Sequence, residues 1–385
     1  MRLAFISTMA AAPWGGSEEL WAASARAALA GGHKVLVSTF DWGSLPPQIE
    51  SLRRDGAQLL LRPRRQTRVQ RLLSAILPIT PPWIHSLSRF EPDAVLISQG
   101  SAYECVARSV TRPLLLWLTR QSSQLPFVNL VQFNRPGVKS KRSTLLAARR
   151  YYHRAAANLF VCSRNIEQAS AWLGTAVPRA RVVCNPANLA DTSALPWPAR
   201  TDDSIRIACV ARLETATKGQ DLLLHALARI NDPRIHLTLA GTGKDLGALR
   251  ALAANLGLEG RVHFPGQVID LRKFWATHHL LALASHFEGT PLAMIEAMLL
   301  ARPVIVTNVG GCDDWVTNDR QGWIAPSAST EHMVAALQTA LQAQQDWPTI
   351  GQAARTRALE LFDPDAGRSL ANLLISSAER DAVSR

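Results

Sequence analysis

The chain has 385 residues, which is enough for two domains. Hydrophobic residues make up 47 % of it and charged residues 19 %, with a mean hydropathy of +0.01, so disordered, collagen-like and coiled-coil proteins are excluded. The five cysteines form no CxxC pair, which excludes a disulfide framework and a zinc ribbon and favours a reducing, cytoplasmic location. No apolar run reaches the roughly 18–20 residues that span a bilayer. We therefore expect a soluble protein.

Positive charge is concentrated in the first half of the chain. The net charge is +12, made of +15 in residues 1–200 (25 Lys and Arg against 10 Asp and Glu) and −3 in residues 201–385 (17 against 20). Such a surface attracts lipid headgroups, pyrophosphate carriers or nucleic acid, although an Arg-rich composition that serves solubility explains it equally well. Nucleic acid is the weaker candidate because no zinc-finger or RNP pattern accompanies the basic runs. These runs are Arg62, Arg64, Arg65, Arg68, Arg71 and Arg135, Lys139, Lys141, Arg142, Arg149, Arg150, Arg154.

Short apolar runs alternate with helical patterns in the first half, which predicts a parallel sheet covered on both faces. The opening strand, residues 2–7, leads through a glycine-containing loop to a helix with Ser17 as its N-cap and Gly31-Gly32 as its stop. Helices are also expected at residues 144–156 and 166–173. The further predicted strands are residues 34–39, 57–61, 93–98, 113–119, 158–162 and 181–184.

A Pro-, Ala- and Asp-rich stretch separates this half from a second one with the same pattern. The predicted division is a first Rossmann-like domain at 1–185, a linker at 186–204 and a second Rossmann-like domain at 205–362. The remaining residues, 363–385, are expected to form a C-terminal helix that could cross back to the first domain. Two doubly wound α/β domains would face each other across a cleft at the carboxyl ends of their strands. The second set of strands is expected at residues 205–210, 235–240, 262–264, 280–284, 303–307 and 322–325.

The segment from Ser285 to Met298 follows a strand and opens a helix. Thr290 suits the N-cap and Pro291 the first helical position, so unpaired N–H groups and the positive end of the helix dipole would face an anion or a hydroxyl. Glu288 lies in the loop, and Glu296 is the one charge between Pro291 and Leu300. A buried carboxylate needs partners, and both ligand hydroxyls and Arg302 would serve for Glu296.

Two further strand ends carry candidate phosphate-binding residues. Arg212 and Lys218 flank the loop after the first strand of the second half, where two cations could clamp a diphosphate or stand in a solvated loop. Gly241 begins a GxGxxxG pattern, whose spacing makes it a weak dinucleotide fingerprint. About 20 residues later, where a ribose-binding acid would end a strand, the chain has His263-Phe264-Pro265, so a nicotinamide site is disfavoured. The triplet Asp363-Pro364-Asp365 fits helix capping better than metal binding, so no metal site is predicted.

Taken together, these segments resemble glycosyltransferase family 4, whose members are retaining enzymes with the two-domain GT-B fold. The resemblance covers almost the whole chain and is strongest from Ile205 to Pro326. Glu288 and Glu296 match the family's E-x7-E motif, Arg212 and Lys218-Gly219 match its diphosphate-binding pair, and Gly310-Gly311 match its glycine pair.

The resemblance implies a UDP- or GDP-linked sugar as donor substrate and no cofactor or metal. Arg212 and Lys218 would stabilise charge on the departing diphosphate, and Glu288 would hold the sugar hydroxyls. Glu296 would hold the ribose hydroxyls. Backbone N–H groups of the loop would bind sugar and phosphate oxygens, and glycines would let the backbone approach. The implied catalytic residues are Arg212, Lys218 and Glu288; the implied donor-binding residues add Gly15, Gly16, Gly241, Gly289, Thr290, Pro291, Leu292 and Glu296.

Two positions depart from the family pattern. Where the family often places a histidine facing the acceptor, after the strand expected to end near Thr119, this chain has Arg120-Gln121. These two residues are the acceptor-side candidates, and Arg120 could meet an anionic acceptor group. Asp314 stands where many members carry Glu.

The sequence therefore predicts a metal-independent, retaining hexosyltransferase that acts in polysaccharide or lipopolysaccharide biosynthesis. Its partners would be a nucleotide sugar and a lipid-linked or polysaccharide acceptor, with an anionic membrane surface at the inner face of the plasma membrane and no nucleic acid. The alternatives are a sugar-nucleotide epimerase or hydrolase on the same scaffold, which would consume donor without acceptor, and a non-catalytic sugar-nucleotide-binding protein.

Overall fold

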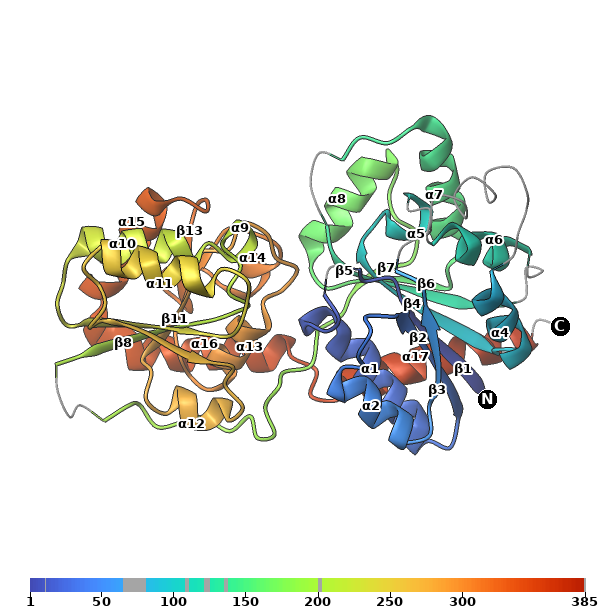
Figure 1. Cartoon of the computed structure of the whole chain (residues 1–385), viewed down its shortest axis with the longest axis horizontal. Helices are drawn as coiled ribbons and strands as arrows, with labels where there is room; N and C mark the ends of the chain where they lie inside the picture. The colour runs from blue at the N-terminus through green and yellow to red at the C-terminus, as the bar shows by residue number, and fades with distance from the viewer. Residues whose placement is uncertain are drawn as a thin grey trace. The chain divides into compact units, whose positions relative to one another are not determined.

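The computed structural model describes residues 1–10, 12–64, 81–107, 111–120, 125–134, 138–199 and 203–383. The chain forms two compact units: Met1–Pro186 with Pro364–Arg385, and Ala187–Asp363. Each unit contains one parallel sheet with helices on both faces (Figure 1). The prediction of two doubly wound α/β domains is confirmed. Within the described ranges, no helix combines the length and the apolar character that crossing a bilayer requires.

The first sheet has seven parallel strands in the order β3-β2-β1-β4-β5-β6-β7. Phe5 in β1 pairs with Val37 of β2 on one side and with Leu96 of β4 on the other. All of β4 is buried, as expected for a central strand of a sheet covered on both faces. The strands are β1 (Arg2–Ser7), β2 (Lys34–Phe40), β3 (Gln58–Arg62), β4 (Ala94–Ser101), β5 (Phe127–Phe133), β6 (Ala157–Phe160) and β7 (Ala180–Val182).

Two apolar cores lie on the two faces of this sheet. One is formed with α1 (Gly16–Ala30), α2 (Pro47–Arg54) and α17 (Ala366–Val383). The other is formed with α4 (Pro82–Phe90), α5 (Glu104–Ala107), α6 (Arg112–Arg120), α7 (Arg142–Arg154) and α8 (Ser163–Leu173).

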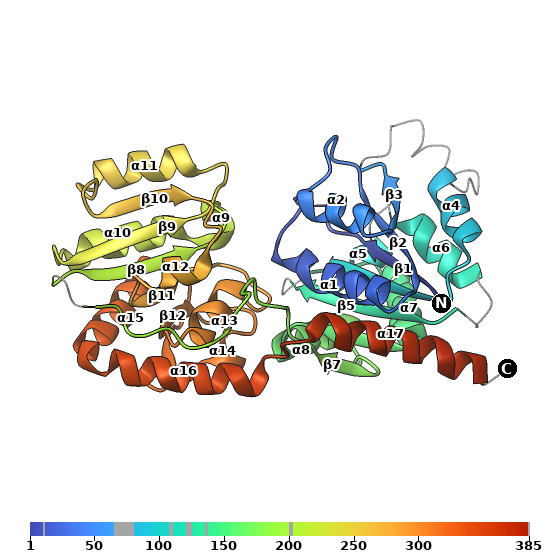
Figure 2. The same cartoon turned by 90° about the horizontal axis from the view of Figure 1, so that it is seen from below.

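Helix α17 completes the first unit although it comes last in the chain. It lies along α1 (Figure 2) and buries Leu370 and Leu374 in the core that α1 also lines. Gly367 permits the close approach, because a Cβ at that position would stand 2.7 Å from the Cβ of Ala23. Residues from both ends of the chain therefore build one core.

The second sheet has six parallel strands in the order β10-β9-β8-β11-β12-β13. They are β8 (Ile205–Val210), β9 (Ile235–Ala240), β10 (Val262–Gly266), β11 (Leu280–Leu283), β12 (Val304–Thr307) and β13 (Gly322–Ala325). Helices α10 (Gln220–Ile230), α11 (Leu246–Asn255) and α15 (Thr330–Gln342) lie on one face, and α12 (Leu271–Trp275), α13 (Leu292–Leu299) and α16 (Trp347–Leu361) on the other (Figure 1). The short helices α9 (Thr215–Lys218) and α14 (Cys312–Trp315) follow β8 and β12, and a 3-10 turn (Gln344–Asp346) precedes α16.

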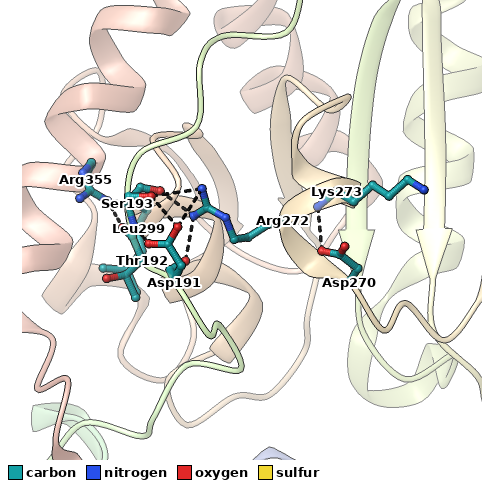
Figure 3. Close-up of polar contacts among 8 residues, drawn as sticks. All are labelled: Asp191, Thr192, Ser193, Asp270, Arg272, Lys273, Leu299 and Arg355. Carbon is teal, nitrogen blue, oxygen red and sulfur yellow. Dashed lines mark hydrogen bonds and ion pairs between the residues drawn. The ribbon is translucent and has the colours of Figure 1, made fainter.

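Much of the stretch expected to be a linker is attached to the second unit. Arg272 of α12 donates from Nη1 to the carbonyls of Asp191 and Ser193, both at 2.8 Å, and its Nη2 lies 3.2 Å from the Asp191 carboxylate (Figure 3). Arg355 of α16 donates to the carbonyls of Thr192 and Leu299. These contacts explain why residues after Pro186 belong to the second unit.

One predicted strand is wrong, and one strand was missed. Residues 113–119 lie in helix α6, where Leu114, Trp117 and Leu118 are buried on one face and Leu116 is 43 % exposed. The strand that occupies this place in the sheet is β5, whose buried Asn129 and Gln132 interrupt the apolar pattern. Asn129 is satisfied within the sheet: it accepts from Gln99 at 2.6 Å and donates to Asn158 at 3.1 Å.

Two predicted helix caps are also wrong. Helix α1 begins at Gly16 with Gly15 as N-cap, so Ser17 lies inside the first turn. Helix α13 begins at Leu292 with Pro291 as N-cap, and neither helix has a side-chain cap hydrogen bond. Thr290 is buried one residue before the cap instead.

Candidate functional site

The second sheet reverses its strand order between β8 and β11, which are hydrogen-bonded neighbours. Ligands of doubly wound proteins bind at such a switch point, outside the carboxyl ends of the strands. The loop after β8 carries Arg212 and Lys218, and the loop after β11 carries Glu288. The topology therefore brings the predicted catalytic segments to one place, although they are far apart in the sequence.

Lys218 and Glu288 form an ion pair at this switch point. Lys218 Nζ lies 2.6 Å from Glu288 Oε1, and the same oxygen accepts a hydrogen bond from Ser285 Oγ at 2.7 Å. The Lys218 side chain is 19 % exposed and that of Glu288 is 10 % exposed. The two loops are also joined through the backbone, because His286 N donates to the carbonyl of Thr217 at 2.9 Å. A cation and a carboxylate are thus held in a fixed and largely buried position.

Glycines allow the loops at this end of the sheet to touch backbone to backbone. Gly219, Gly241 and Gly310 have φ values of +59°, +139° and +55°, which L side chains rarely adopt. A Cβ on each would overlap a carbonyl oxygen: that of Ala284 for Gly219, Ala211 for Gly241 and Gly289 for Gly310. Gly311 N donates to the same Gly289 carbonyl at 2.7 Å. Gly241 and the Gly310-Gly311 pair therefore shape the loops that carry the ion pair.

Glu296 is buried in α13 with 3 % exposure. Its Oε1 accepts a hydrogen bond from the backbone N–H of Asn188 at 3.0 Å, so the segment after Pro186 reaches this carboxylate. Sequence reasoning missed Asn188, because a backbone donor leaves no signal in residue type.

The alternative that Arg302 pairs with Glu296 is wrong. The fully buried guanidinium of Arg302 donates to backbone carbonyls, among them those of His278 at 2.9 Å and Pro196 at 2.8 Å. Burial lowers the pKa of Arg302 to about 10. Arg302 therefore has a structural role that does not involve Glu296.

Arg212 lies in the same loop but projects further into solvent. Its side chain is 51 % exposed, and its Nη1 is 3.9 Å from Glu214 Oε2. Lys244 Nζ lies 3.3 Å from the other oxygen of Glu214, so one carboxylate serves two cations. The loop itself is fixed, since Gln220 Nε2 donates to the Arg212 carbonyl at 2.7 Å and Thr215 N donates to Asp245 at 2.8 Å. These bonds to Thr215 lower the pKa of Asp245.

The remaining donor-side residues are backbone candidates. Gly289, Thr290, Pro291 and Leu292 form the turn from the Glu288 loop into α13, and Gly15 and Gly16 form the turn into α1. Gly15 has an extended backbone with φ −176°, and a Cβ there would meet nothing closer than 4.0 Å. Packing within the first unit therefore does not require a glycine at position 15.

The acceptor-side candidates are placed differently from expectation. Arg120 ends helix α6 instead of following a strand, because residues 112–120 are helical. Gln121 lies outside the described residues, as do Arg65, Arg68, Arg71 and Arg135 of the basic runs. Arg62 is not a surface charge: it is 1 % exposed, and its guanidinium lies 4.6 Å from the ring centre of Phe40.

Two buried carboxylates at the switch point of the first sheet were missed. Glu104 accepts from Thr8 Oγ1 at 3.1 Å, which joins the loops after β1 and β4. Glu18 in α1 accepts from Ser7 Oγ at 2.9 Å and from Trp21 Nε1. Desolvation raises the pKa of Glu18 to about 7, against the opposing effect of these hydrogen bonds. Both residues look like ordinary acidic residues of a first helical turn, so residue type and position do not indicate their burial.

Comparison with known proteins identifies a domain in the second unit. Residues 204–343 match the family described as Glycosyl transferases group 1. The MMP alpha-(1->4)-mannosyltransferase of Mycolicibacterium hassiacum is 28 % identical over 41 % of this chain and 39 % of its own length. The lipopolysaccharide core biosynthesis glycosyltransferase LpsE of Rhizobium meliloti is 29 % identical over 31 % of this chain and 35 % of its own length. The chain thus matches well under half the length of these relatives.

Solved structures share the fold over nearly the whole chain. Anabaena HepE, crystallised with UDP, aligns with a TM-score of 0.74 and 17 % identity, covering 98 % of this chain and 100 % of that one. The lipopolysaccharide outer core galactosyltransferase WaaB aligns with a TM-score of 0.71 and 17 % identity, covering 98 % and 99 %. This chain therefore has the two Rossmann-like sheets of the GT-B glycosyltransferase fold, with a glycosyl transferases group 1 domain at residues 204–343.

Proposed function

We propose that the protein is a retaining glycosyltransferase that moves a hexose from a UDP- or GDP-linked sugar to an acceptor. The observation that carries this proposal is the Lys218–Glu288 ion pair of 2.6 Å at the switch point of the domain that matches glycosyl transferases group 1. A nucleotide sugar presents hydroxyls beside a diphosphate. A carboxylate next to an ammonium group offers a hydrogen-bond acceptor for the hydroxyls and a cation for the diphosphate.

Each residue of the site has a distinct role in this proposal. Lys218 and the more exposed Arg212 stabilise negative charge on the departing diphosphate. In other enzymes a divalent cation has this role. Glu288 orients the sugar hydroxyls, and Ser285 fixes the carboxylate through its 2.7 Å hydrogen bond. Glu296 accepts hydrogen bonds from the ribose hydroxyls, and the backbone N–H groups of residues 289–292 contact sugar and phosphate oxygens.

The acceptor in this proposal is a lipid-linked or lipopolysaccharide-type glycan at the cytoplasmic face of the plasma membrane. Two observations support it. Residues 1–200 carry a net charge of +15, which favours an anionic surface. Similar proteins include LpsE of lipopolysaccharide core biosynthesis and AmsK of amylovoran biosynthesis in Erwinia amylovora, the latter 27 % identical over 44 % of this chain.

The test is a donor screen followed by the mass of the product. The purified protein is incubated with UDP- and GDP-sugars and an extract of lipid-linked glycans, with and without a chelator of divalent cations. We expect a product heavier by one hexose, with the anomeric configuration retained and with equal rates in the chelator. Lys218→Ala and Glu296→Ala should each reduce the rate at least 100-fold, while Lys273→Ala, an exposed lysine on α12, should not.

Three outcomes would contradict the proposal in different parts. Full activity of both site variants would reject the assigned site. Donor consumption without an acceptor product would indicate a hydrolase or an epimerase. Sedimentation with anionic vesicles that is absent, or unchanged by high salt, would reject the membrane-surface acceptor.

A further inference from the structure

The first unit contains a cavity of about 490 Å³ that is remote in the sequence from the proposed donor site. It lies at the amino ends of β5, β6 and β7, the opposite edge of this sheet from the switch point of β1 and β4. Its walls come from the segment before β5, the end of α7, the start of β7 and the last turns of α17. Four arginines line it: Arg154, Arg179, Arg181 and Arg380.

Backbone carbonyls hold several of these guanidinium groups in place. Arg179 donates from Nε to the carbonyl of Ala155 at 2.9 Å and also to that of His153, at the end of α7. Arg154 donates to the carbonyl of Leu118, and Arg380 donates from Nε to that of Ser376 at 3.2 Å. A guanidinium has five N–H donors, so the bonds of Arg179 to Ala155 and His153 orient this group without using all of its donors.

The lining is one-sided in charge. None of the described residues that line the cavity carries a carboxylate, whereas four carry a guanidinium. Desolvation by burial lowers the pKa of Arg154. Like charges held around one space repel each other, and an anion between them removes this repulsion.

Capping of helix ends explains only part of this arrangement. Arg154 and Arg179 satisfy carbonyls at the ends of α6 and α7, which is a structural role. The backbone of Arg181 pairs with β6, but its side chain forms neither a hydrogen bond nor an ion pair to another described residue and is exposed at the cavity. A purely structural account leaves Arg181 unexplained.

We propose that this cavity binds phosphate groups, as a second anion site separate from the donor site. Arginine matches the paired oxygens of phosphate through two parallel N–H donors, and several arginines suit a diphosphate or a phosphodiester better than a single carboxylate. The phosphate could belong to a lipid headgroup or to a soluble phosphate compound, which share this chemistry.

The experiment measures phosphate binding directly, so it does not depend on the proposed transfer reaction. Both measurements use the full chain with Arg212→Ala and Lys218→Ala, because the donor site would otherwise bind the same probe. Pyrophosphate is titrated by calorimetry at low and high salt, and sedimentation is measured with phosphatidylcholine vesicles with and without phosphatidylglycerol. The test variant adds Arg181→Gln and Arg380→Gln. The control adds Arg89→Gln and Arg112→Gln, which remove the same charge from exposed positions outside the cavity.

We expect one saturable, salt-sensitive site that the test variant weakens at least tenfold and the control leaves within twofold. If the test variant loses pyrophosphate binding, the ligand is a soluble phosphate compound. If it loses only vesicle binding, the ligand is a lipid headgroup. Binding of neither probe would overturn the proposal, as would equal weakening in the test and control variants. Melting temperatures of both variants check that the fold is intact.

Discussion

Lys218 Nζ and Glu288 Oε1 lie 2.6 Å apart, although 70 residues separate them in the sequence. Lys218 follows β8 and Glu288 follows β11. The two residues meet because these strands are neighbours in the sheet. A third side chain, Ser285, fixes the carboxylate from the same loop. The proposed chemistry therefore depends on sheet order as much as on the charged residues.

Replacing Glu288 should reduce turnover and leave the protein folded. Glu288→Gln keeps the shape but removes the negative charge that faces Lys218, which weakens both the contact with the ammonium group and the proposed hydrogen bonds from sugar hydroxyls. We expect kcat to fall about 100-fold or more with little change in melting temperature. The control is Glu214→Gln, which lies in the neighbouring loop and should change kcat only a few-fold. Equal effects of the two substitutions would contradict the role of Glu288.

Arg302 should matter for stability alone. Arg302→Met leaves several buried carbonyls without a donor, and each unsatisfied group is costly. We expect the free energy of unfolding to fall by about 3 kcal/mol or more, measured by urea denaturation. Arg250→Met, at an exposed position on α11, should fall within about 0.5 kcal/mol of the wild type. A loss of activity at unchanged stability would show that Arg302 acts on Glu296 or on substrate.

Gly310 should not tolerate a side chain. Gly310→Ala places a Cβ against the carbonyl of Gly289 at φ +55°, which displaces the loop that holds Glu288. We expect a loss of about 2 kcal/mol or more in stability together with a fall in activity. Gly247→Ala is the matched control, because it meets no atom within 4 Å in α11 and should stabilise that helix by up to about 1 kcal/mol. Normal stability of Gly310→Ala would contradict the backbone contact.

Glu18 should make the first unit less stable as the pH rises from about 4.5 to about 7. Desolvation raises the pKa of Glu18 from 4.5 to about 7, so the folded protein holds this proton more tightly than the unfolded chain does. The stabilisation is complete below pH 4.5 and is lost as the pH passes 7, a total of about 3 kcal/mol.

The check is urea denaturation at pH 5 and pH 8 for the wild type and for Glu18→Gln. The substitution removes the titrating group, so the difference in unfolding free energy between the two proteins should change with pH. A difference that is the same at both pH values would show that Glu18 keeps an ordinary pKa.

The sequence predicted the repeated strand–helix pattern well because buried parallel strands are continuous apolar runs. It failed at residues 113–119, where Leu114 to Leu118 look equally apolar in either structure and only the spacing of Leu114, Trp117 and Leu118 indicates a helix. It missed β5 because Asn129 and Gln132 look solvent-exposed in sequence, although Asn129 hydrogen-bonds to neighbouring strands.

The candidate site in the second unit was easier to predict than the buried carboxylates of the first unit. Lys218 and Glu288 lie in the segments that follow two apolar strands, so their position at the carboxyl edge of the sheet follows from the chain order. The surroundings of Glu296 could not be predicted, because its donor is the backbone of Asn188 from a distant segment. Burial of Arg62, Glu18 and Glu104 likewise depends on tertiary packing that residue type does not encode.

Because α17 belongs to the first unit, the two units are expected to complete their folding in a set order during translation. Residues 187–363 form one uninterrupted piece and can fold as soon as they leave the ribosome. The first unit, although it is translated earlier, lacks one wall of its core until Leu370 and Leu374 have emerged. A chain that stops at residue 363 would therefore expose the apolar face of α1 and aggregate through its first unit, while its second unit stays folded.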